Sequence, residues 1–352
     1  MKSKRTAVIL GLIGLVAVLL GCKKTEAGKS NVESQDSQSS DVTQVVLTTG
    51  FGKDEVFRIG KSTCKLDEFM VYLTNIQNRY ESVYGSQLWS VSSNGISMES
   101  RIKDTVAARI AQVKTMNLLA EEYQVTLTDE EQRQVAAAAR EYYNSLNQTE
   151  IEAMGATEEL IGMLFSEYLI AHKVYAYIIR DINPEISDDE ARSVTVDWIF
   201  LKSQEENGEI EKLARDIKNR LSAGEDFYTL AAAYSDDKTV THSFGKGIMD
   251  RAVEECAFNL ATDETGDVVK GADGYYVIHC VNTLDRKETD ANKEKIITKR
   301  KKEAFNQVYG TFTEKQVRQL NEGLWEHISL IHDKQVRTSD FFDIYEKYFP
   351  KE

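Results

Sequence analysis

Apolar residues recur at three- and four-residue intervals through the first half of the chain, which is the spacing of one face of a helix. The first such face is formed by Leu66, Phe69, Met70, Leu73, Ile76 and Tyr80. A second helix is predicted around residues 102–113. A third is predicted to begin at Thr128, because the Thr128 hydroxyl and the Glu131 carboxylate can form a capping box at a helix N-terminus. A fourth is predicted over about residues 157–180. Residues 47–186 are therefore expected to form an all-helical domain.

The pattern changes after Pro184, which cannot continue a helix. The segment VTVDWIFLK is typical of a strand, and the segment 209–235 predicts two helices broken at Gly224. A glycine-containing loop (THSFGKG), a short helix around VEECAFNL and a closing strand (YYVIHCV) follow. Residues 187–285 are expected to form a compact α+β domain.

The last part of the chain, residues 286–352, again has helical periodicity. We expect it to pack on the N-terminal helical domain, because neither part alone buries all its apolar stripes. The basic run KRKKE at 299–303 suggests a membrane or nucleic-acid patch. Basic and acidic residues are nearly balanced over the segment, however, so a solvated helix face is the better interpretation.

The chain begins with a basic segment and an apolar run from Ala7 to Leu20, followed by Gly21 and Cys22. The run is shorter than the roughly 20 apolar residues that cross a bilayer, so it predicts an export signal. The ending resembles a bacterial lipobox, which implies removal of residues 1–21 and a lipid on Cys22. The alternative is a plain signal peptide with an accidental cysteine. Residues 22–46 are expected to be a lipidated cysteine and a flexible polar tether.

Composition narrows the possible partners. The formal net charge of the 352-residue chain is −14, and loss of the signal removes three further positive residues. Nucleic acid is therefore not expected as a partner. The mature chain keeps Cys64, Cys256 and Cys280 besides Cys22, which does not indicate a disulfide framework, although one pair is possible.

Four segments in the middle of the chain resemble a parvulin, a small peptidyl-prolyl isomerase domain. They are VTVDWIFLK, LSAGEDFYTLAAAYSDD, IMDRAVEECAFNLATDETGDVV and DGYYVIHCV. With the lipobox, the helical N-terminal domain and the C-terminal helices, the chain is similar to the PrsA/SurA foldases. The resemblance implies an α+β architecture in which a helical chaperone-type domain, completed by C-terminal helices, carries an inserted parvulin-like domain.

The resemblance also implies a set of site residues. A parvulin binds the proline ring in an apolar notch, and the matching positions here are Phe244, Met249 and Val253, for which a plain core role is an alternative. Asp237 stands at the acidic position of the catalytic centre. Trp198 and Tyr276 replace the two histidines of that centre, and neither side chain reproduces a pair of imidazoles. Whether catalysis is retained is therefore left open by the sequence.

His279 and Cys280 are adjacent in the closing strand, so they point to opposite faces and cannot act as a thiolate–imidazole pair. We interpret both as structural. The remaining histidines have no metal-ligand spacing, and no metal or cofactor is expected. His242, near the expected notch, is the one that could supply a missing imidazole.

These observations favour an extracytoplasmic, membrane-anchored foldase whose clients are unfolded exported polypeptides. Two alternatives remain. The parvulin-like domain could have lost catalysis, which leaves a holdase chaperone. The chain could instead be a lipid-anchored scaffold for one envelope partner. The oligomeric state is open.

Overall fold

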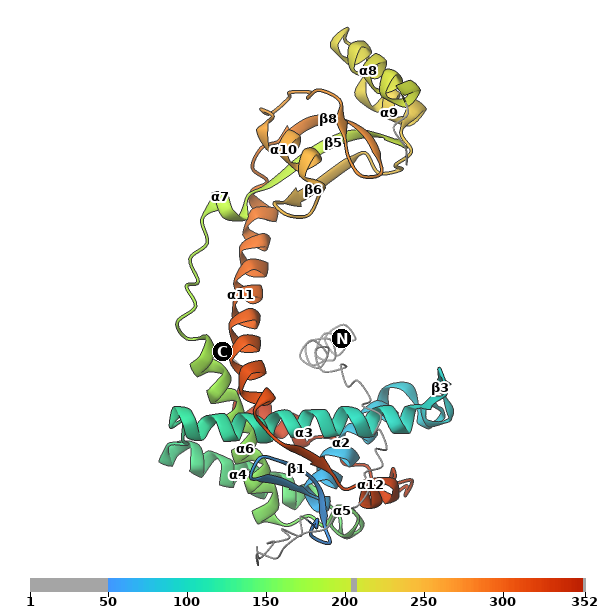
Figure 1. Cartoon of the computed structure of the whole chain (residues 1–352). Coiled ribbons are helices and arrows are strands. Elements are labelled where there is room, and N and C mark those ends of the chain that lie inside the picture. The colour runs from blue at the N-terminus through green and yellow to red at the C-terminus, as the bar shows by residue number, and fades with distance from the viewer. Residues whose placement is uncertain (1–49, 204–207, 351–352) are drawn as a thin grey trace, which may run out of the picture. The chain divides into compact units, whose positions relative to one another are not determined.

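The computed structural model describes residues 50–203 and 208–350. The predicted signal, Cys22 and the tether at 22–46 lie outside these residues. The described chain divides into two compact units, coloured along the chain in Figure 1. We call the described parts of 1–178 and 308–352 the helical unit, and the described part of 179–307 the sheet unit. The predicted domain limits of 47–186, 187–285 and 286–352 stay a prediction.

The helical unit combines long helices with short strands. Its strands are β1 (Glu55–Ile59), β2 (Ser62–Lys65), β3 (Ser92–Ser93), β4 (Ile96–Ser97) and β9 (Arg318–Leu320). Its helices are α2 (Leu66–Tyr84), α3 (Met98–Tyr123), α4 (Asp129–Ser145), α5 (Gln148–Met154), α6 (Glu158–Ile179), α12 (Glu322–His327) and α13 (Phe341–Tyr348), with a 3-10 turn η1 (Ser86–Ser90). The four helices expected from periodicity are present as α2, α3, α4 and α6, and Thr128 and Glu131 form the expected capping box of α4.

The expectation of an all-helical N-terminal domain was wrong. β1 pairs with β2 in an antiparallel hairpin, and β9 pairs with the other edge of β1, where Phe57 lies opposite Leu320. Strand β1 is short, and β9 is exposed and lacks an apolar pattern, so neither produced a clear signal in the sequence. The strand pairing depends on segments that are far apart along the chain.

The core of the helical unit contains residues from both ends of its sequence. Phe341 of α13 is fully buried, and its ring lies 4.5 Å from that of Phe165, 5.3 Å from that of Tyr142 and 5.5 Å from that of Tyr72. Edge-to-face and tilted ring pairs of this kind add to the free energy gained by burial. The prediction that C-terminal helices complete the N-terminal domain is confirmed.

Polar contacts fix the chain around Phe341. The side-chain oxygen of Asn75 accepts the backbone N–H of Phe341 at 3.2 Å, and its amide nitrogen donates to the Tyr142 hydroxyl at 2.6 Å. Buried Glu150 accepts the backbone N–H groups of Arg337 and Thr338, each at 2.8 Å. The approach to α13 is thus held by buried acceptors, which would be costly to leave unpaired.

The sheet unit is a four-stranded antiparallel sheet with helices on both faces. Its elements are α7 (Asp188–Ala191), β5 (Ser193–Lys202), α8 (Gly208–Ser222), α9 (Phe227–Tyr234), β6 (Thr241–Gly245), α10 (Arg251–Asn259), β7 (Val269–Lys270), β8 (Gly274–Asn282) and α11 (Arg286–Glu314), which continues beyond residue 307. The strand order is β6-β5-β8-β7. The two central strands, the paired helices α8 and α9, and α10 agree with the sequence prediction.

Residues 241–245 were expected to be a loop and instead form strand β6. They pair with β5 in a regular register, in which His242 lies opposite Val196 and Phe244 opposite Val194. The segment THSFGKG lacks the apolar alternation that predicts a strand, because β6 is an edge strand in which three positions are not buried. This pairing brings His242 beside the centre of the sheet.

Side chains alternate across the sheet and form two separate cores. One face, with Trp198, Tyr276 and Cys280, packs on α10, and the other, with Ile199 and Val277, packs on α8 and α9. In the run at 299–303, Lys299 lies 3.9 Å from Glu303 and Arg300 lies 2.5 Å from Glu190, which fits a solvated helix face. None of the described helices combines the length and apolarity that a membrane crossing requires.

Replacing Phe341 by alanine tests how strongly the C-terminal segment supports the helical unit. We expect Phe341→Ala to lower the free energy of unfolding by about 3–5 kcal/mol, because it leaves a cavity among Phe165, Tyr142 and Tyr72. Urea unfolding followed by circular dichroism measures the change. Tyr84→Ala, which removes an aromatic ring that is 53% exposed, is the control and should cost less than about 1 kcal/mol. Equal losses in the two variants would contradict the central role of Phe341.

Candidate functional site

Three of the residues singled out in the sequence lie together on the α10 face of the sheet. Trp198 of β5 and Tyr276 of β8 are in edge-to-face contact, with ring centroids 5.5 Å apart and planes at 80°. Phe244 of β6 lies 6.2 Å from Trp198 by ring centroids, and Phe200 lies 4.7 Å from Tyr276. Strand alternation explains the grouping, because Trp198 and Phe200 are two residues apart on one strand. The face carries a row of aromatic rings.

Asp237 lies beside this row and is held by neighbouring donors. Its Oδ2 accepts a hydrogen bond from the indole Nε1 of Trp198 at 3.1 Å, and its Oδ1 accepts the backbone N–H of Thr239 at 2.9 Å. The side chain is 31% exposed. The predicted acidic position and the tryptophan at one histidine position are therefore in direct contact.

His242 completes the group. Its ring is stacked on the indole of Trp198, with centroids 3.6 Å apart and planes at 17°, and its Nε2 lies 3.4 Å from Oδ2 of Asp237. The same Nε2 lies 2.9 Å from the carbonyl oxygen of Thr239. Because a carbonyl only accepts, this contact assigns a proton to Nε2. The imidazole thus presents an N–H between the Thr239 carbonyl and the Asp237 carboxylate.

The surroundings decide which of these groups is charged. Burial raises the pKa of Asp237, but the hydrogen bonds from Thr239 and Trp198 and the nearby His242 outweigh it, so the net pKa lies below the usual value. Burial raises the pKa of Tyr276, and the carboxylates of Asp250, Asp273 and Asp237 add to this effect. At neutral pH these directions favour a carboxylate at Asp237 and a neutral phenol at Tyr276.

The three residues proposed for a proline notch differ in exposure. Val253 of α10 is fully buried and Phe244 is 7% exposed, whereas Met249 is partly buried. All three pack in the same cluster as Trp198 and Tyr276. The notch therefore stays a prediction, in which Met249 offers most of the surface that a ligand could reach.

His279 and Cys280 lie on opposite faces of β8. Cys280 is fully buried in the cluster with Trp198, and burial raises the pKa of its thiol, which disfavours the thiolate. Nδ1 of His279 lies 3.0 Å from the Thr265 hydroxyl on the other side. Cys64, Cys256 and Cys280 are all free thiols. Within residues 50–203 and 208–350, no group of three or more His, Cys, Asp or Glu side chains is arranged to hold a metal ion.

Sequence reasoning missed Asp197, a buried acid on the opposite face from Trp198. Asp197 is 2% exposed, and its carboxylate accepts hydrogen bonds from the Tyr228 hydroxyl at 2.7 Å and the Thr241 hydroxyl at 2.6 Å. These contacts fix α9 and the start of β6 against β5, and thereby the position of His242. A single acid inside the apolar strand VTVDWIFLK was the available signal.

Comparisons with known proteins find similar sequences. Residues 184–284 match the family model described as the PPIC-type PPIase domain. A foldase protein PrsA of Caldanaerobacter subterraneus is 27% identical over 229 residues, which cover 60% of this chain and 68% of that protein. A foldase protein PrsA of Halalkalibacterium halodurans is 38% identical over 87 residues, which cover 23% and 25% of the two chains.

Solved structures include similar chains. The crystal structure of a peptidylprolyl isomerase (PrsA) from Bacillus cereus matches with a TM-score of 0.36 and 21% identity, over 73% of this chain and 97% of that chain. The sequence matches confirm the resemblance to PrsA-type foldases with a parvulin domain.

Replacing Asp237 by asparagine tests the charge at the site. The lowered pKa means that the ionised group stabilises the fold above its usual value of 3.8, and that this contribution is lost as pH falls through the lowered pKa. We expect Asp237→Asn to lower the free energy of unfolding at neutral pH by about 1 kcal/mol, with the difference from wild type shrinking in acid.

Urea titrations at about pH 7 and about pH 3 measure this difference. Asp273→Asn, which changes an exposed carboxylate of the same unit, is the matched control and should have little effect. A deficit of Asp237→Asn that stays constant from neutral to acid pH would refute a role for the charge.

Proposed function

We propose that this chain, which carries a PPIC-type peptidyl-prolyl isomerase domain at residues 184–284 and resembles the PrsA foldases, is an extracytoplasmic foldase anchored to the membrane by a lipid on Cys22. Its proposed clients are unfolded exported polypeptides. The match of the family model to the sheet unit is the observation that carries the proposal. The predicted domains at 47–186, 187–285 and 286–352 are its proposed functional parts.

Isomerisation of an X-Pro bond needs no nucleophile. The barrier to rotation about a peptide bond is about 18–20 kcal/mol, and a protein lowers it by favouring the twisted, less conjugated amide. An apolar surface for the proline ring and an oriented polar centre are sufficient for this. Met249, which packs on the buried aromatic row, offers such a surface, and Asp237 with His242 offers such a centre.

We assign the polar centre to the pair of Asp237 and His242. His242 takes the place of the imidazoles that Trp198 and Tyr276 replace, because its Nε2 lies within 3.4 Å of the carboxylate. Trp198 positions both residues through its hydrogen bond to Asp237 and its stacking on the imidazole. Phe244, Met249 and Val253 form the wall of the proposed proline notch, with Val253 supporting it from below the surface.

Proline isomerisation by the full chain is the test of this assignment. We expect the wild type to accelerate cis/trans exchange of short X-Pro peptides, and we expect Asp237→Ala and His242→Ala each to lower that acceleration about tenfold, as befits the loss of one charge-assisted contact. Exchange spectroscopy by NMR measures the rates. Asp216→Ala is the control, because it changes an exposed carboxylate of α8, which packs on the opposite face of the sheet.

A specific observation supports a second candidate, a holdase without catalysis. Both carboxylate oxygens of Asp237 already accept hydrogen bonds, from Trp198 and Thr239, so the group is engaged before a client binds. A wild type that leaves the exchange rate unchanged would reject catalysis and favour the holdase. Rates in His242→Ala equal to those of wild type would reject the role of His242 alone.

Exposed apolar side chains support binding of unfolded chains. Val83 and Tyr84 at the end of α2, and Val91 and Ile96 around the β3–β4 hairpin, are each about half exposed, at 46–53%. Such side chains can hold unfolded segments weakly. A scaffold for one envelope partner is the remaining alternative. Suppression of the aggregation of several unrelated unfolded proteins favours a chaperone, whereas binding of a single folded partner favours the scaffold.

Lipid attachment can be tested separately in a bacterial host that processes lipoproteins. We expect the full chain to partition into the detergent phase of Triton X-114, and Cys22→Ser to move to the aqueous phase, because Cys22 is the proposed acylation site. Cys64→Ser is the control, since Cys64 is buried in the fold. Detergent-phase partitioning of the Cys22→Ser chain would contradict the lipobox interpretation.

A further inference from the structure

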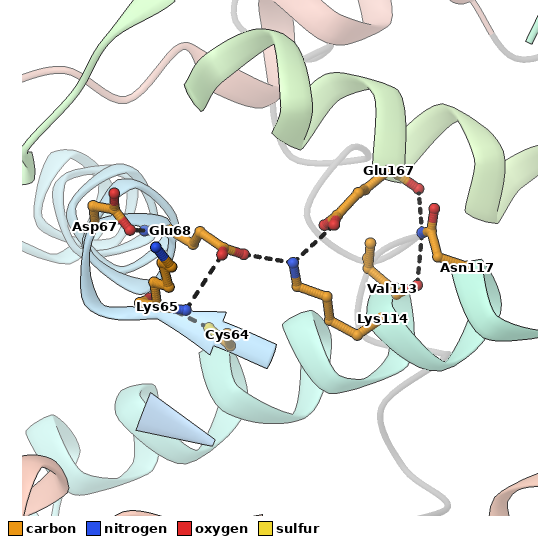
Figure 2. Close-up of polar contacts among 8 residues, drawn as sticks. All are labelled: Cys64, Lys65, Asp67, Glu68, Val113, Lys114, Asn117 and Glu167. Atoms are coloured by element: carbon orange, nitrogen blue, oxygen red, sulfur yellow. Dashed lines mark hydrogen bonds and ion pairs between the residues drawn. The ribbon is translucent and has the colours of Figure 1, made fainter. Parts of the chain in front are cut away.

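Three helices of the helical unit meet at a buried group of charges. Lys114 of α3 lies between two carboxylates, with its Nζ 2.6 Å from Oε2 of Glu68 in α2 and 2.8 Å from Oε1 of Glu167 in α6. We call these three residues the ion cluster, and Figure 2 shows the lysine reaching toward both acids. The side chains of Glu68 and Lys114 are 5% and 4% exposed, whereas that of Glu167 is 21% exposed.

The cluster holds two carboxyl groups and one ammonium. Burial raises the pKa of Glu68, and the nearby Lys114 only partly offsets this. Burial lowers the pKa of Lys114, but Glu167 and Glu68 outweigh it and the net pKa is raised, so the lysine stays charged. Oε2 of Glu68 has the Lys114 ammonium as a partner at 2.6 Å, and a carboxylate oxygen has two lone pairs. This oxygen can therefore accept a hydrogen bond from a further donor.

An open cavity of about 460 Å³ lies against the ion cluster. All three members of the cluster line it, together with Thr63 of β2 and the apolar Leu160 and Met163 of α6. Two further lysines at the rim are paired with acids outside the lining, Lys61 with Glu121 at 2.5 Å and Lys65 with Asp54 at 3.4 Å. The cavity therefore combines apolar walls with the two carboxyl groups of the ion cluster, which have the single ammonium of Lys114 between them.

The sheet beside the cavity can receive an extended chain. Ser62, Thr63 and Lys65 of β2 line the cavity, and β2 is an edge strand that, within the described residues, pairs only with β1. Edge strands are common docking places for extended peptides, with pockets for alternate side chains. An unfolded polypeptide laid along this edge would place a side chain at the cavity mouth.

We propose that this cavity binds an arginine side chain of an unfolded polypeptide, with the guanidinium donating to Glu167 and Glu68 and the aliphatic stem packing on Leu160 and Met163. Arginine suits the site better than lysine, because its fork of donors matches carboxylates and it is less strongly hydrated. The proposal rests on the proposed function for the source of the side chain. It adds to that function a preference for basic residues in a site separate from the aromatic row.

The test compares two capped peptides, acetyl-Thr-Val-Arg-Val-Thr-amide and the same peptide with citrulline, the neutral counterpart of arginine. Neither contains proline, so binding does not report on the proline notch. Isothermal titration of the full chain should show that the arginine peptide binds at least about tenfold more tightly than the citrulline peptide, as expected for a charge-assisted contact. Binding should weaken as salt is raised. Equal affinities, or no binding of the arginine peptide, would overturn the proposal.

Two variants locate the site. Glu167→Gln removes a negative charge and should weaken arginine-peptide binding about tenfold. Met163→Lys places an ammonium four residues before Glu167 on α6, where it can occupy the acid, and should have a similar effect. Met163 is 39% exposed, so this second variant leaves the core intact if Glu167→Gln proves unstable. Glu159→Gln, an equal charge change at an exposed position of α6, should bind like the wild type, and equal weakening by it would overturn the site.

Aggregation assays on an unrelated unfolded protein separate this proposal from the proposed function. Suppression of aggregation together with equal binding of the two peptides would overturn the arginine site and leave the chaperone function standing. Selective arginine binding without suppression of aggregation would support the cavity as a cation site and count against its use for clients.

Discussion

The helical unit depends on contacts between residues from the two ends of the described chain, such as Tyr72 with Phe341 and Phe57 with Leu320. Phe341 fills the space among Tyr72, Tyr142 and Phe165, and β9 extends the β1–β2 hairpin into a three-stranded sheet. Without the C-terminal segment, the faces of α2, α4 and α6 that contact it would be exposed to water. The chain therefore leaves the helical unit, forms the sheet unit as an insertion, and then returns to the helical unit.

This constraint separates two kinds of chemistry. The sheet unit has its own cores on both faces of its sheet, and the group of Trp198, Asp237 and His242 is built entirely within it. The helical unit carries the ion cluster and its cavity. The proposed proline notch and the proposed arginine site thus lie in separately packed parts of one chain.

Much of the architecture follows from local patterns in the sequence. The long helices, the two central strands and the break between α8 and α9 follow from apolar periodicity and from capping at Thr128. Strands β6 and β9 do not, because edge strands with exposed polar side chains lack the alternation that marks a buried strand. Their places are set by partners that are distant in sequence.

The candidate site shows the same limit. Asp237, Trp198 and Tyr276 could be singled out from the resemblance, but the stacking of His242 on Trp198 follows from the register of β6 against β5. Likewise, Glu68, Lys114 and Glu167 lie on three helices and share no motif, so only tertiary packing brings them together. The spacing of residues in the sequence predicts contacts within one helix or strand well, but it predicts contacts between different helices and strands poorly.

The insertion also has a consequence for the order in which the chain can acquire its structure. Residues 179–307 are continuous, so their sheet can form as soon as that stretch is available. The helical unit must instead join β1 to β9 across a loop that contains the whole sheet unit, and prior folding of the sheet unit shortens the effective length of that loop. When such a chain is synthesised from its N-terminus, α2, α4 and α6 have an incomplete core until the C-terminal residues have been made. For a time, the helical unit of such a chain is therefore only partly folded and exposes apolar surface to water.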